Sequence, residues 1–214
     1  YTGEDTLSLH DALPIYARVQ LAGALDGAIW QEIFNVFSDF CNRTDLWYED
    51  LALVLAAPPY ARGDTFALPA VTSARPNRLL YVLNPDNIAR SMSMPTPGTL
   101  EFIDSADMAQ TWTARVAFCP DDPVPTSGTL TGIPQLPAWM LEKYHLGLLA
   151  GVVGTMMTHV GKPYTNPNMA KYHLTKYMNT VSEGKNDARR QNIYGVQRWN
   201  FPQDFATVSG RRGI

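Results

Sequence analysis

Apolar side chains recur at every fourth position in the first quarter of the chain, and this spacing predicts an amphipathic helix. The row consists of Leu21, Leu25, Ile29, Ile33, Phe37 and Cys41, broadened by Trp30, Phe34 and Phe40. It is broken at residues 42–44, where asparagine tolerates the left-handed conformation that ends helices. Aromatic side chains of this density indicate a packed interface. We expect four residues of this region to be structural core: Phe37, Phe40, Cys41 and Trp47.

The middle of the chain, about residues 58–132, is predicted to form a small antiparallel sheet. Short runs that favour strands alternate there with turns rich in proline and glycine. These runs are Thr65–Leu68, Arg78–Leu83, Thr99–Ile103 and Thr111–Phe118. The preceding apolar run Leu51–Ala57 can continue a helix, which the two following prolines would end. Cys119–Gly132 is predicted to be a loop.

A second helix is predicted over Pro137–Val160, because the next three residues are Gly, Lys and Pro. Its Gly147, Ala150, Gly151 and Gly154 form a face of small residues that lets another helix approach closely.

A third helix is predicted to start at Asn166 and Pro167, a cap followed by a residue suited to the first turn. Its apolar stripe consists of Ala170, His173, Tyr177, Val181, Gly184 and Ala188. We expect the second and third helices to form an antiparallel hairpin joined by Gly161–Thr165, with Trp139 and Tyr177 in the core.

These elements predict an α+β fold: a helical bundle of one N-terminal helix and a C-terminal helical hairpin, with an inserted small antiparallel β-sheet. A length of 214 residues suits one domain, which we assign to residues 16–205. Residues 206–214 are predicted to be a flexible basic tail. Residues 1–15 are expected to be non-native or disordered, because Thr6–Ile15 resembles a translated sequencing-adaptor fragment.

Charge divides the chain into an acidic and a basic part. Residues 1–135 hold 7 Lys and Arg against 16 Asp and Glu, a net charge of −9. Residues 136–214 hold 10 against 4, a net charge of +6. Such a separation favours head-to-tail stacking or docking on a charged partner, or it marks two solvated faces.

Familiar catalytic signatures do not occur in the sequence. It has no Gly-rich phosphate loop, no GxSxG and no HExxH motif. Cys41 and Cys119 lie far apart and have no metal-binding spacing. We therefore predict no catalytic residue, no cofactor and no bound metal.

Residues in several of these elements carry a resemblance to a known family. The first are Phe40, Cys41, Thr44 and Trp47, which form FC-x-x-T-x-x-W. The others are Tyr144, Gly151, Met156, Met157, Lys162, Pro163, Tyr164, Ala170, His173 and the run Trp199–Pro202. In this order the chain resembles the head–tail connector proteins of tailed bacteriophages, also called adaptor, head-completion or neck proteins. The resemblance extends from about Arg18 to Phe205.

This resemblance implies a non-enzymatic virion protein, assembled in the cytoplasm of the host bacterium and located at the junction of head and tail. A ring of about a dozen copies would dock beneath the portal protein and contact tail proteins. Double-stranded DNA would pass through its lumen without sequence-specific binding, and no membrane would be involved. The arginine and aromatic content of the C-terminal region is typical of interface anchors. The candidate portal or ring interface consists of Arg189, Arg190, Arg198, Trp199, Phe201, Arg211 and Arg212.

Two alternatives remain open at this point. A small metal-dependent enzyme is one, because His159 and His173 could flank the loop of the hairpin and share a metal ion. A membrane-active phage protein that uses Leu146–Val160 is the other, although this helix is polar for a membrane span.

Overall fold

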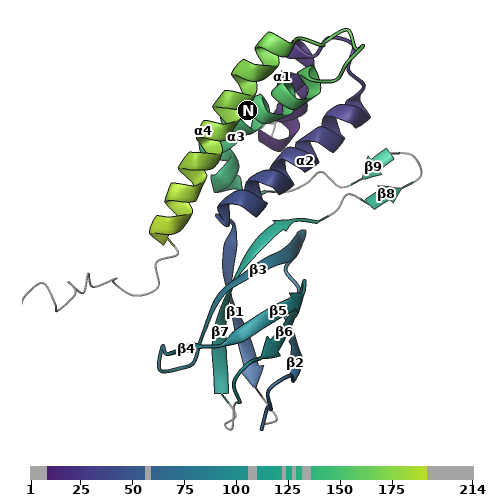
Figure 1. Ribbon diagram of the computed structural model, residues 1–214. Coiled ribbons are helices and arrows are strands. Elements are labelled where there is room, and N and C mark those ends of the chain that lie inside the picture. The colour runs from purple at the N-terminus through teal and green to yellow at the C-terminus, as the bar shows by residue number, and fades with distance from the viewer. Residues whose placement is uncertain are drawn as a thin grey trace, which may run out of the picture.

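The computed structural model describes residues 9–55, 59–105, 110–121, 124–126, 129–131 and 136–191. Helices gather at one end of the molecule and most strands at the other, whereas a short separate hairpin lies beside the helices (Figure 1). The sheet-forming strands lie between the second and third helices in the sequence. The predicted α+β class, a helical bundle with an inserted antiparallel sheet, is therefore confirmed.

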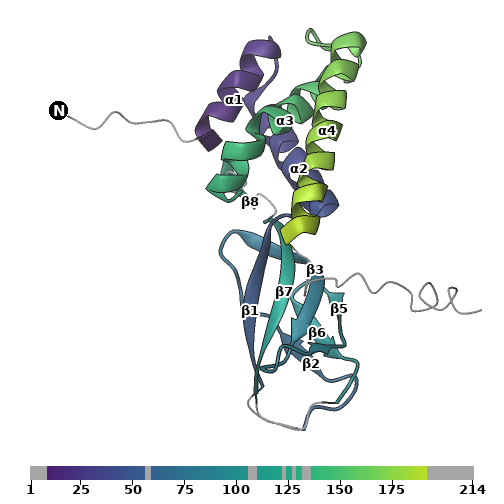
Figure 2. The same ribbon diagram turned by 90° about the vertical axis from the view of Figure 1, so that its left-hand side faces the viewer.

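Four helices are present in the described residues: α1 (Leu9–Gln20), α2 (Asp26–Thr44), α3 (Ala138–Met157) and α4 (Pro167–Gln191). α3 lies between α1 and α4, and α2 packs against both α3 and α4 (Figures 1 and 2). α3 is thus the central helix of the bundle.

The N-terminal region holds two helices where the spacing predicts one. Gly23, with a φ of 84°, turns the chain between α1 and α2. Leu25 precedes α2 and is 79% exposed, so its predicted place in the buried row is wrong. The spacing continues across the turn because each helix has its own buried row. Leu21 is buried directly after α1, and the row of α2 starts with Ile29.

Part of the segment expected to lie outside the fold belongs to α1. Residues 9–15 are helical, and Leu13 is buried in the hydrophobic core together with Ala17. Residues 1–8 lie outside the described residues. The first helix therefore starts earlier than the sequence interpretation allows.

Strands β1 to β7 form two antiparallel sheets in the described residues. The four-stranded sheet has the order β1-β7-β3-β4, formed by Tyr48–Leu55, Gln110–Pro120, Ala74–Leu83 and Ala89–Arg90. The three-stranded sheet has the order β2-β6-β5, formed by Thr65–Ala67, Thr99–Phe102 and Met92–Thr96. A separate hairpin pairs β8 (Val124–Thr126) with β9 (Thr129–Thr131).

The four predicted strands are confirmed, and two neighbouring segments differ from expectation. Residues 51–55 extend β1, where Leu51, Leu53 and Leu55 are buried and alternate with exposed residues. The predicted loop 119–132 is wrong, because β7 continues to Pro120 and β8 and β9 follow. Threonine and valine on either side of a Ser-Gly dipeptide are the signal for this hairpin.

The core of the strand-rich end lies between the two sheets. Trp112 of β7 pairs in register with Leu53 of β1, and its ring centroid lies 5.7 Å from that of Phe102 in β6. Phe102 in turn stacks on Tyr60 at 5.0 Å. Aromatic contacts across the sheets therefore hold this end together.

Glycines bring α3 and α4 into close contact, as the small-residue face predicts. A Cβ atom added at Gly147 would lie 2.0 Å from Thr180 Oγ1, and one added at Gly154 would lie 3.0 Å from the Leu174 backbone nitrogen. Asn166 caps α4, because its Oδ1 accepts a hydrogen bond from the backbone N–H of Met169 at 3.2 Å. The predicted helical hairpin is confirmed.

Candidate functional site

The chain passes from the bundle into the sheet through a turn at the end of α2. Thr44 Oγ1 donates a hydrogen bond to the carbonyl of Phe40 at 2.8 Å and accepts one from the Leu46 N–H at 3.4 Å. Asp45 adopts a left-handed conformation with a φ of 53°, and its N–H donates to the carbonyl of Cys41. The FC-x-x-T-x-x-W residues therefore build the turn that orients the helices against the sheet.

Trp47 completes the turn by packing against the central strand. Its carbonyl accepts a hydrogen bond from the N–H of Phe118 at 2.8 Å, and the two ring centroids lie 6.2 Å apart. Both residues are buried. Trp47 thus links the end of α2 to β7.

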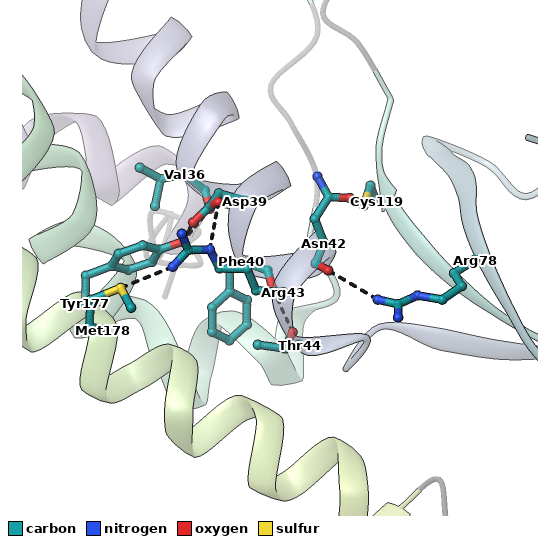
Figure 3. A network of polar contacts seen from close by, with 10 residues as sticks. All are labelled: Val36, Asp39, Phe40, Asn42, Arg43, Thr44, Arg78, Cys119, Tyr177 and Met178. Carbon is teal, nitrogen blue, oxygen red and sulfur yellow. Dashed lines mark hydrogen bonds and ion pairs between the residues drawn. The ribbon is translucent and has the colours of Figure 1, made fainter.

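A polar network joins α2 to α4 beside this turn (Figure 3). The Tyr177 hydroxyl donates to Asp39 Oδ2 at 2.7 Å and lies 3.3 Å from the Val36 carbonyl. Arg43 Nε lies 3.0 Å from Asp39 Oδ1, and its NH1 group lies 3.2 Å from Met178 Sδ. Burial, followed by the hydrogen bond to Asp39, raises the pKa of Tyr177, so the hydroxyl stays a donor at neutral pH.

The two cysteines meet between α2 and β7 as buried free thiols. A hydrogen bond with Cys119, together with burial, holds the pKa of Cys41 well above its usual value. Cys119 Sγ donates to Asn42 Oδ1 at 3.0 Å (Figure 3). The cysteines therefore help to attach the end of α2 to the sheet.

Arg115 of β7 connects the sheet to the end of α4. Its guanidinium binds both carboxylate oxygens of Asp50, at 2.7 and 2.6 Å. The ring centroids of Tyr48 and Tyr81 lie 4.4 and 5.0 Å from the guanidinium carbon. NH1 lies 3.4 Å from the carbonyl of Gln191, the last residue of α4. Arg115 thus places a cation at the helix C-terminus, where the helix dipole favours it.

A cleft lies where α2, β3 and α4 converge, and we call it the junction cleft. Its volume is about 310 Å³. It is lined by Arg43, Thr44, Asp45, Arg78, Leu80, Lys185, Ala188 and Arg189. Four of these residues are cationic and one is acidic, so the arrangement suits an anionic group.

The predicted core residues are buried except one. Phe37, Phe40, Cys41, Trp47 and Tyr177 are all buried. Trp139 is 45% exposed, so its assignment to the core is wrong. It lies in the first turn of α3, where the neighbouring Met140 and Leu141 occupy the buried face.

The candidate interface residues divide between described and undescribed parts of the chain. Arg189 and Arg190 are exposed in the last turn of α4, and Arg189 lines the junction cleft. Arg198, Trp199, Phe201, Arg211 and Arg212 lie outside the described residues. The sequence gives no signal for the partners of Arg189, because Arg43 and Arg78 come from distant elements.

The histidine pair and the apolar helix can also be placed. His159 is exposed just after α3, whereas His173 lies on α4 beside Gly154 of α3. Burial, followed by Lys176, lowers the pKa of His173. Across the residues that the structure describes, no three His, Cys, Asp or Glu side chains gather as a metal site would require. In the described ranges, no helix is both long enough and apolar enough to cross a membrane.

Comparisons with known proteins do not place the chain in a family. No family model matches the chain, and no curated protein matches it.

Proposed function

We propose that this protein is a structural component of the neck of a tailed bacteriophage. Copies assemble into a ring below the portal protein, connect it to tail proteins and continue the channel for double-stranded DNA. The proposal draws on the resemblance of the FC-x-x-T-x-x-W turn and the helical hairpin to head–tail connectors. In this protein that turn sets the angle at which the bundle meets the sheet, and neighbouring copies in a ring need a fixed angle.

The observation that carries the proposal is a pair of different apolar surfaces on the two outer helices of the bundle. The α1 surface consists of Ile15, Tyr16 and Val19, and all three are exposed. The α4 groove has a volume of about 490 Å³ and is lined by Thr158, Pro167, Ala170, Lys171, Leu174, Thr175 and Met178. α3 separates the two helices (Figure 2).

Such a pair suits a ring. A cyclic assembly with more than two members needs a head-to-tail contact between two different surfaces of each copy. The α1 surface of one copy fits this role as the convex partner, and the α4 groove of the next copy fits it as the concave partner. Burying an exposed aliphatic side chain such as Val19 contributes about 1.5–3 kcal/mol. Several such side chains at each contact stabilise a closed ring.

A complementation experiment tests this arrangement. Val19→Glu places a charge on the α1 surface, and Thr175→Glu places one in the α4 groove; both residues are exposed, so the fold is retained. Each variant alone is expected to be monomeric by light scattering. Mixed, they are expected to form a heterodimer, because each retains the one surface that the other lacks.

Two outcomes contradict the proposal. Rings that persist in both variants would place the contact elsewhere on the molecule. A mixture that stays monomeric, although both variants show the circular dichroism of the parent, would mean that the two surfaces do not bind each other.

A further inference from the structure

The junction cleft gathers cations from three elements that are distant in the sequence. Arg43 comes from the last turn of α2, Arg78 from β3, and Lys185 and Arg189 from the C-terminal half of α4. The lining also includes the apolar residues Leu80 and Ala188, of which Ala188 is buried. The cleft therefore combines positive charge with apolar contact surface.

Two of these cations pair with carboxylates, whereas the other two have no such partner among the residues that the structure describes. Arg43 pairs with Asp39, and Arg78 NH2 lies 2.8 Å from Asp45. Lys185 and Arg189 form no ion pair with any carboxylate in the described ranges. Both lie one turn apart on the same side of α4, so their charges add. The cleft carries positive charge that an external anion can neutralise.

The size of the cleft favours carboxylate side chains of a peptide over the phosphates of a DNA duplex. A volume of about 310 Å³ is at the lower end for a small-ligand pocket and admits a few side chains. Carboxylate side chains on a peptide can enter such a space and pair with the planar guanidinium forks. A DNA duplex is a broad cylinder whose phosphates reach only a rim. The apolar lining residues also suit a peptide, because a peptide has apolar groups that can pack against them and a phosphate group has none.

We propose that the junction cleft binds an acidic segment of a partner protein, whose carboxylates pair with Lys185 and Arg189. The identity of the partner rests on the proposed function: a neck protein must dock on another virion protein. The binding itself needs one copy only. Binding at the cleft can therefore be tested independently of ring assembly.

Binding of a labelled hexaglutamate peptide to the full chain, followed by fluorescence anisotropy, tests the proposal. The wild-type protein is expected to bind the peptide, with an affinity that falls as salt is added. The double variant Lys185→Gln, Arg189→Gln is expected to bind it about tenfold more weakly, a loss of about 1.4 kcal/mol. The control Lys162→Gln, Lys176→Gln removes the same charge outside the cleft and is expected to bind like the wild type.

Three results would overturn the proposal. One is the absence of hexaglutamate binding by the wild type. Another is an equal loss of hexaglutamate affinity in the cleft and control variants, which would mean that the peptide is attracted by the overall surface charge and not by the cleft. The third is a 20-base-pair DNA duplex that binds more tightly than the peptide and is weakened by the cleft variant, which would make phosphate the ligand.

The ring variants keep this test apart from the proposed function. Monomeric Val19→Glu protein that binds hexaglutamate like the wild type supports the cleft irrespective of the ring. A ring that assembles normally and does not bind the peptide rejects only the cleft.

Discussion

Single side chains link the helices of the bundle to one another near the junction with the sheet. Tyr177 is the clearest case, because its ring packs against Gly151 of α3 while its hydroxyl reaches Asp39 of α2. One residue of α4 thus contacts both α2 and α3. The raised pKa of Tyr177 keeps the hydroxyl protonated, so the hydrogen bond is available over the whole neutral range.

Tyr177→Phe keeps the ring and removes only this hydroxyl. We expect the free energy of unfolding, measured by urea denaturation, to fall by about 1–2 kcal/mol, because a partly buried hydrogen bond to a carboxylate is lost. Tyr172→Phe is the matched control on the same helix, since Tyr172 is 55% exposed. Its effect should lie within about 0.5 kcal/mol of zero. Equal effects of the two changes would mean that the Asp39 contact adds nothing to stability.

At the scale of elements, the helical hairpin depends on the absence of side chains. Gly147 faces Thr180 so closely that α3 and α4 cannot keep their distance if Gly147 gains a methyl group. Gly151 and Gly184 similarly face Val36 and Phe40 of α2. Small residues thus set the spacing among three helices.

Gly147→Ala tests this spacing. Alanine favours helix by about 1 kcal/mol over glycine, but the clash with Thr180 should outweigh this and destabilise the protein by about 1–3 kcal/mol. Gly27→Ala in the first turn of α2 is the control, because nothing lies within 4 Å of the added Cβ atom. It should stabilise the protein by up to about 1 kcal/mol. Thermal unfolding of the two variants gives the comparison, and a shift of the same sign in both would contradict the account.

The helices could be predicted from the sequence more reliably than the contacts between them. The spacing of apolar residues and the Asn-Pro cap predict α2, α3 and α4, because these signals are local. The turn at Gly23 was missed, because the buried rows of α1 and α2 happen to continue each other. Trp139 was misplaced, because hydrophobicity alone does not tell which side of a helix a first-turn residue faces.

At the scale of the whole molecule, the sites are made by long-range contacts that the sequence does not reveal. The junction cleft unites Arg43, Arg78 and Arg189, which only the fold brings together. Among the predicted interface residues, Arg189 alone lines this cleft in the described part of the chain. The α1 surface was also unexpected, because the predicted helical row begins only at Leu21 and no helix was expected before it. The charge asymmetry of the sequence predicts docking on a charged partner, and the junction cleft is the surface that we propose for it.

In the neck ring that we propose, these surfaces would have separate roles. The outer helices α1 and α4 would form the contacts between neighbouring copies. The junction cleft would bind an acidic partner, and the turn after α2 fixes the cleft relative to the sheet. A ring built in this way can grow by lateral contacts and still keep the cleft of each copy free for the partner.

We propose that this chain assembles on a portal. Mixing the full chain with the portal protein encoded in the same genome, and measuring the mass of the product by size-exclusion chromatography with light scattering, tests it directly. We predict a single complex whose mass is that of the portal ring plus about a dozen copies of this chain. Separate elution of the portal and of a monomeric chain would contradict the account.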